Sequence, residues 1–130
     1  MLTYKNNDPY IEGTSLYDLV KVCETPFYVY SQEKIINQVN KTKEILGNNI
    51  FYSIKSNSNQ AILKLMNSLD IGADVVSVGE LKRALEAGFD PKKIIFEGVG
   101  KSEQDLLYAM HKNIRLICLL YTSPSPRDKS

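Results

Sequence analysis

Residues 50–76 read IFYSIKSNSNQAILKLMNSLDIGADVV, two short apolar runs separated by a longer segment. The runs at 50–54 and 73–76 have the length and composition of strands. Between them, apolar residues stand at positions 62, 65, 66 and 69, the spacing of one helix face. The stretch therefore predicts a strand, a helix and a second strand, the unit from which parallel sheets are built.

The same rhythm continues toward the carboxyl end. Strand-like runs recur at 93–96 and 114–117, Ser77 and Glu80 have the spacing of a capping box, and Ser102 is placed to begin another helix. Strand starts about twenty residues apart fit either a doubly wound sheet or part of a (β/α)8 barrel. Because a barrel of eight strands takes about 250 residues, the barrel interpretation makes this chain an incomplete front half.

The amino-terminal part has a less regular pattern. Ser15 is placed to cap a short amphipathic helix over 15–24, and the aromatic run FYVY at 27–30 predicts a strand. Ser31 is placed to cap a second helix, which Gly47 ends.

The last residues break the rhythm. From 118 to 130 the chain passes into serine, proline and charge without a further helix, which is typical of a linker or disordered tail. The segment also resembles a translated sequencing adapter. We therefore expect 118–130 to be a non-native or disordered tail, with the native reading frame ending near 115–118.

Composition excludes several classes of function. The 130 residues are 43% hydrophobic, enough for a packed core, and 16 basic residues balance 15 acidic ones without clustering, which disfavours nucleic-acid binding. Cys23 and Cys118 lack the spacing of a metal site, so we expect none. A signal sequence and a long apolar run are both missing from the sequence, which predicts a cytoplasmic protein that does not enter a membrane.

The stretch GVGKS at 98–102 imitates two phosphate-binding motifs. A Walker A loop requires glycine at 95, where Ile95 stands, and the dinucleotide fingerprint requires glycine at 103, where Glu103 stands. We interpret it as a glycine-bearing turn between a strand and a helix.

Lys55 is a candidate catalytic residue. It directly follows a predicted strand, and in both α/β architectures active sites form at the carboxyl ends of the strands. A partly desolvated lysine amine can form a Schiff base with a carbonyl cofactor, and Phe51, Tyr52 and Ile54 are candidates for an apolar setting. The alternative is a surface lysine that reaches past these residues to water.

Asp74 is unusual because it lies inside a predicted strand. A buried carboxylate is costly unless it is paired. It either faces the active site together with Lys55 or is a strand-end residue satisfied by backbone amides. Ser77 and Glu80 are more simply explained as helix caps.

Three blocks carry a family resemblance: TPFYVYS (25–31), FYSIKSNSNQAILKLM (51–66) and GADVVSVGELKRALEAGFDPKKIIFEGVGKSEQDL (72–106). In this order they resemble the amino-terminal part of the diaminopimelate decarboxylase branch of the alanine-racemase-like, fold type III, pyridoxal-phosphate (PLP) decarboxylases. The resemblance runs from about Tyr10 to Arg115. It implies that Lys55 is the lysine that carries PLP and that Asp74 is the family's aspartate near the cofactor.

The resemblance also implies the architecture. Residues 31–117 would form the first part of a PLP-binding (β/α)8 barrel, and residues 1–30, with their FYVY strand, would contribute to an accompanying β domain. The glycine-rich phosphate loop and the substrate-specificity segments are missing, so we expect this chain alone to be inactive and poorly folded.

The implied reaction is loss of CO2 from the D-configured centre of meso-2,6-diaminopimelate, which gives L-lysine, in a cytoplasmic homodimer that acts on a small amino acid. Alternatives are an ornithine or arginine decarboxylase of the same fold, a racemase, a non-catalytic homologue that binds a partner protein, and a βα binding module with an incidental lysine. The intact Lys55 disfavours a non-catalytic homologue.

Overall fold

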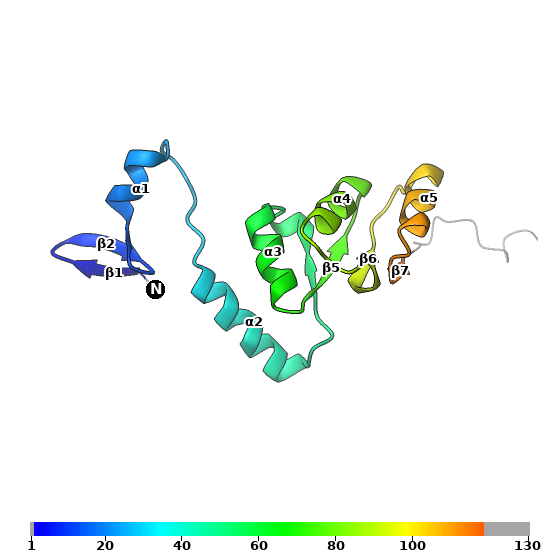
Figure 1. Cartoon of the computed structure of the whole chain (residues 1–130), viewed down its shortest axis with the longest axis horizontal. Helices are drawn as coiled ribbons and strands as arrows, with labels where there is room; N and C mark the ends of the chain where they lie inside the picture. Colours follow the sequence, from blue (N-terminus) through cyan, green and yellow to red (C-terminus); the bar gives the residue numbers. More distant parts are fainter. Residues whose placement is uncertain (1, 119–130) are drawn as a thin grey trace, which may run out of the picture. The chain divides into compact units, whose positions relative to one another are not determined.

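The computed structural model describes residues 2–118, which belong to two compact units that divide between Ile45 and Leu46 (Figure 1). The tail predicted for 118–130 lies, apart from Cys118, outside the described residues. Among residues 2–118, no helix is long and apolar enough to cross a membrane.

The first unit begins with a three-stranded antiparallel sheet in the order β1-β2-β3. Its strands are β1 (Leu2–Lys5), β2 (Asp8–Ile11) and β3 (Thr14–Ser15). The two-residue loops at 6–7 and 12–13 have positive φ throughout, as in the type I′ turns that suit hairpins. None of these three strands is among the elements predicted from the sequence. The pairs Asn6-Asn7 and Glu12-Gly13, which lie one strand length apart, were the sequence signal for the two hairpin turns.

The first unit also contains helix α1 (Leu16–Val22) and all but the last residue of helix α2 (Gln32–Leu46). Ser15 caps α1 as predicted, because its hydroxyl accepts the amide of Tyr17 at 3.2 Å. Ser31 caps α2 and also donates its hydroxyl to the Glu12 carboxylate. Hydrogen bonds from the Ser31 hydroxyl and from the Glu33 amide hold the pKa of Glu12 below its usual value.

The strand predicted at 27–30 is wrong. The structure gives this run no regular element, and Tyr28 is 90% exposed. A strand requires a hydrogen-bonded neighbour, and the strands described in the first unit pair only with one another. Aromatic and β-branched composition favours extended backbone but does not supply that neighbour.

The second unit is a four-stranded parallel sheet in the order β4-β5-β6-β7. The strands are β4 (Phe51–Ser53), β5 (Gly72–Val75), β6 (Ile94–Phe96) and β7 (Leu116–Ile117), and the helices that connect them are α3 (Gln60–Ser68), α4 (Val78–Glu86) and α5 (Glu103–His111) (Figure 1). Each strand pairs with the next one in sequence, as in a (β/α)8 barrel. A doubly wound sheet would reverse direction at a switch point.

The two faces of this sheet differ in burial. Ala73, Val75, Ile94 and Phe96 are almost completely buried, and α4 packs against β5 and β6. Ser53, Asp74, Ile95 and Leu116 are paired in register on the opposite face, where Leu116 remains 52% exposed. The core therefore lies between the sheet and its helices, and the other face carries polar as well as apolar side chains.

The predicted capping box at Ser77 and Glu80 needs one correction. The Ser77 hydroxyl accepts the Glu80 amide at 3.2 Å, but the Glu80 carboxylate accepts the amide of Val76, at 2.9 Å, instead of that of Ser77. A complete capping box occurs at α5, where Ser102 and Asp105 bond to each other's backbone amides at 3.2 and 2.9 Å.

Gly72 is expected to tolerate no side chain. A Cβ there would lie 2.5 Å from a Phe51 ring carbon and 2.8 Å from the Lys93 carbonyl oxygen. In the full-length protein, we expect Gly72→Ala to lower the free energy of unfolding by about 1–3 kcal/mol, the usual cost of overpacking. Gly79→Ala is the matched control, because the nearest atom to a Cβ there is 3.7 Å away and helical alanine is favoured over glycine. Equal urea midpoints for the two variants would contradict this prediction.

Asp105 is expected to make stability depend on pH in the acid range. Bonds from the Ser102 amide and then its hydroxyl lower the pKa of Asp105 from 3.8. The stabilising contribution of Asp105 is therefore complete at pH values above its pKa in the unfolded chain. It is lost as the pH falls through the pKa of Asp105 in the folded protein. Asp105→Asn should lower the urea midpoint at about pH 7 and much less at about pH 3. Gln104→Ala, an exposed change without a titratable group in the same helical turn, should show no such pH-dependent difference.

Candidate active site

Lys55 lies at the carboxyl edge of the parallel sheet, as predicted. Strand β4 ends at Ser53, and the following 3₁₀ turn, η1 (Ile54–Ser56), carries the lysine. The turn is anchored by Ile54, which is 0% exposed and belongs to the core. Lys55 itself is exposed, so the apolar setting expected from its neighbours does not enclose the amine within the described residues.

Asp74 is brought close to the same edge by strand pairing. It is the third residue of β5 and pairs with Ser53, two positions before Lys55. Paired residues of parallel neighbouring strands point to the same face, so the Ser53 and Asp74 side chains share the face opposite the helices. The structure therefore places Asp74 beside the strand that leads into Lys55, although the two residues are 19 positions apart in sequence.

Ser53 and Asp74 also share a chemical property. The Ser53 Oγ and the Asp74 Oδ1 are buried and have no hydrogen-bond partner among the described residues. A buried polar atom without a partner costs about 1–3 kcal/mol. The alternative prediction, a carboxylate satisfied by backbone amides, is therefore wrong for Oδ1. Both atoms therefore keep unused hydrogen-bonding capacity on the face opposite the helices.

Lys101 has a role that the sequence analysis missed. Its Nζ donates to the carbonyl oxygens of Gly98 at 2.6 Å and Cys118 at 2.5 Å, and it lies 5.4 Å from the centre of the Phe96 ring. The lysine of the Walker-like stretch thus ties the loop after β6 to the end of β7. Positive φ angles at Gly98 and Gly100 agree with the glycine-bearing turn that we predicted.

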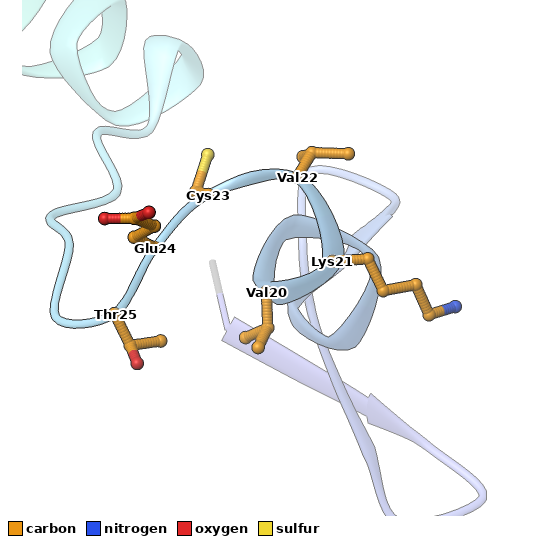
Figure 2. A pocket seen from close by; sticks show the side chains of 6 residues that line it. All are labelled: Val20, Lys21, Val22, Cys23, Glu24 and Thr25. Atoms are coloured by element: carbon orange, nitrogen blue, oxygen red, sulfur yellow. The ribbon is translucent and has the colours of Figure 1, made fainter.

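A hollow on the surface of the first unit is not a candidate site. It is lined by six consecutive residues, Val20 to Thr25, at the end of α1. Figure 2 shows that their side chains point in different directions and do not converge on one point. Within residues 2–118, no three His, Cys, Asp or Glu side chains gather where they could hold a metal ion.

The chain is similar to decarboxylases in sequence and in structure. Residues 32–122 match the family model described as pyridoxal-dependent decarboxylase, pyridoxal binding domain. The chain is 38% identical over 114 residues to a diaminopimelate decarboxylase of Aquifex aeolicus, covering 87% of this chain and 27% of the relative. It is 44% identical over 98 residues to one of Campylobacter jejuni, covering 73% and 24%.

A solved structure gives the same result. The diaminopimelate decarboxylase of Helicobacter pylori complexed with L-lysine superposes with a TM-score of 0.71 at 40% identity, over 78% of this chain and 27% of that one. The chain thus spans about a quarter of the length of these relatives. The family match covers more than half of the chain and includes the whole parallel sheet. The chain therefore belongs to the pyridoxal-dependent decarboxylases and forms part of their pyridoxal-binding domain, built as the first strands and helices of a (β/α)8 barrel.

Proposed function

We propose that the protein that contains this chain is a diaminopimelate decarboxylase, which removes CO2 from the D-configured centre of meso-2,6-diaminopimelate and yields L-lysine. The observation that carries the proposal is the similarity to relatives of this name, one of them solved with L-lysine bound. The position of Lys55 supports it, because an amine at a strand's carboxyl end is what a carbonyl cofactor requires.

The described residues fit PLP. Lys55 offers an exposed amine that can bond to the cofactor's aldehyde, and the unpartnered Ser53 and Asp74 oxygens offer polar contacts on the adjoining strands. When bound, PLP supplies an electron sink for the negative charge left on the substrate carbon as CO2 departs. Lys55 would hold the cofactor, and Asp74 would orient it and supply a negative charge beside it.

These residues do not make a complete site. The chain spans about a quarter of its relatives, and barrel enzymes draw catalytic residues from the ends of several strands. We therefore propose that this segment alone is inactive and that the complete protein holds the remaining cofactor and substrate contacts. We also propose that the complete protein is cytoplasmic and, from the family resemblance, that it is a homodimer.

Labelling of Lys55 tests the proposal. We expect the full-length protein purified with PLP to show a visible absorption band, and borohydride reduction should leave a pyridoxyl group on the peptide that contains Lys55. Lys55→Ala should remove the label and lower kcat by roughly a hundredfold or more. Lys64→Ala, at an exposed lysine of α3, should change neither the label nor kcat.

Two other outcomes would contradict the proposal. A folded wild-type protein without label on Lys55 would instead favour a non-catalytic partner-binding homologue. Faster turnover of ornithine or arginine than of diaminopimelate would contradict the proposed substrate.

Asp74 is expected to contribute to cofactor affinity. Asp74→Asn keeps the shape of the side chain but removes its charge, and a hydrogen bond to a charged group contributes about 1.5–3 kcal/mol. We expect the Kd for PLP, measured by titration of the apoprotein, to rise roughly ten- to a hundredfold. Glu86→Gln, an exposed change on α4, is the control. An unchanged Kd for Asp74→Asn would remove Asp74 from the proposed site.

A further inference from the structure

The position of Lys55 must be fixed by contacts of its backbone, because its side chain is not held by burial. Its side chain is exposed, and it stands on the short segment 54–59 that joins β4 to α3. Ile54 anchors the beginning of this segment in the core. Residues 57–59 have no regular secondary structure, so the backbone beyond Lys55 must be held by contacts with other parts of the chain.

Arg83 provides such a contact from the next βα unit. Its Nε and Nη2 atoms both donate to the Ser58 carbonyl oxygen, at 2.9 and 2.7 Å. In return, the side-chain amide of Gln60 donates to the Arg83 carbonyl oxygen at 3.1 Å. The Arg83 side chain thus bonds to the backbone of Ser58, and the Arg83 backbone to the side chain of Gln60, which links the middle of α4 to the start of α3.

Tyr52 holds the adjoining carbonyl. Its hydroxyl donates to the Asn57 carbonyl oxygen at 3.1 Å. Two successive carbonyls, those of Asn57 and Ser58, are therefore bound by side chains that lie outside the segment. On the far side, the Asn59 side chain caps α3 by accepting the Ala61 amide at 2.8 Å. Arg83 is the connection in this set that comes from a different βα unit.

An exposed arginine with these bonds has a simpler explanation, which is that it stabilises the fold. The geometry favours a more specific role. Both guanidinium donors converge on one carbonyl, three residues after Lys55, which restrains the direction of the backbone as well as its distance from α4. A lysine at this position offers a single point charge without the planar fork, so it would hold the carbonyl less rigidly.

We propose that Arg83 is a positioning residue for Lys55, acting through the Ser58 carbonyl. The inference rests on the proposed function, in which Lys55 holds the cofactor. Without the clamp, the segment would sample more conformations and the Lys55 amine would less often meet the cofactor in a reactive orientation. Small losses of alignment in an active site can lower rates by up to about a hundredfold.

The experiment uses the full-length protein with three variants. Arg83→Met removes the fork, and Arg83→Lys keeps the charge without it. Lys64→Met is the matched control, because it removes an exposed cation from the neighbouring helix α3. Apoprotein of each is mixed with PLP, and the rate at which the visible band of bound cofactor develops is measured. The kcat and KM for diaminopimelate and the urea midpoint are measured on the same preparations.

We expect Arg83→Met to slow development of the band and to lower kcat, each roughly tenfold, with KM changed less than about twofold. Arg83→Lys should lie between Arg83→Met and the wild type, and Lys64→Met should match the wild type. An arginine with only a structural role would lower the urea midpoint and leave the rate of band development unchanged, which would overturn the inference. If Arg83→Met does not fold, the comparison of Arg83→Lys with Lys64→Met decides by the same criteria.

The two proposals can fail separately. Borohydride labelling of the wild type is done first, and absence of label from Lys55 overturns both the proposed function and the positioning role. If Lys55 is labelled but the band develops equally fast in Arg83→Met and Lys64→Met, the proposed function stands and the role of Arg83 is rejected.

Discussion

The stepwise pairing of four parallel strands is the constraint on which the second unit depends. Each crossover advances the chain by one strand position in the order β4-β5-β6-β7, and crossovers of this kind are right-handed. Repeated steps of the same hand keep the connecting helices on one face of the sheet. They also place successive carboxyl ends side by side, so Lys55 after β4 and Asp74 in β5 come to one edge through the register that pairs Ser53 with Asp74.

The two faces of the sheet serve different purposes. On the helix side, side chains such as Val75 and Phe96 lose nearly all contact with water, which is the main source of stability for the unit. On the other side, the Ser53 and Asp74 oxygens are buried without a partner among the described residues, which costs stability. Departures of this kind from full hydrogen bonding are typical of functional sites.

Long cationic side chains hold the loops at the carboxyl edge. Arg83 binds the Ser58 carbonyl after β4, and Lys101 binds the carbonyls of Gly98 after β6 and Cys118 after β7. Irregular backbone leaves carbonyl groups that no helix or strand satisfies. Cations from neighbouring segments satisfy these carbonyls, so hydrogen bonds add to the burial of Ile54 in holding the edge that carries Lys55.

The sequence by itself determined the local elements: the positions of β4 to β6, the helices between them, the caps at Ser15, Ser31 and Ser102, and Lys55 at a strand end. These follow from periodicity and capping, which act over a few residues. The barrel-like strand order was decided by the tertiary structure, because a βα rhythm does not specify which strands pair. The same holds for the absence of a strand at 27–30, which depends on a partner, and for the unsatisfied Asp74 oxygen and the Arg83 clamp. Each of these depends on residues that are distant in sequence and meet only when the chain folds.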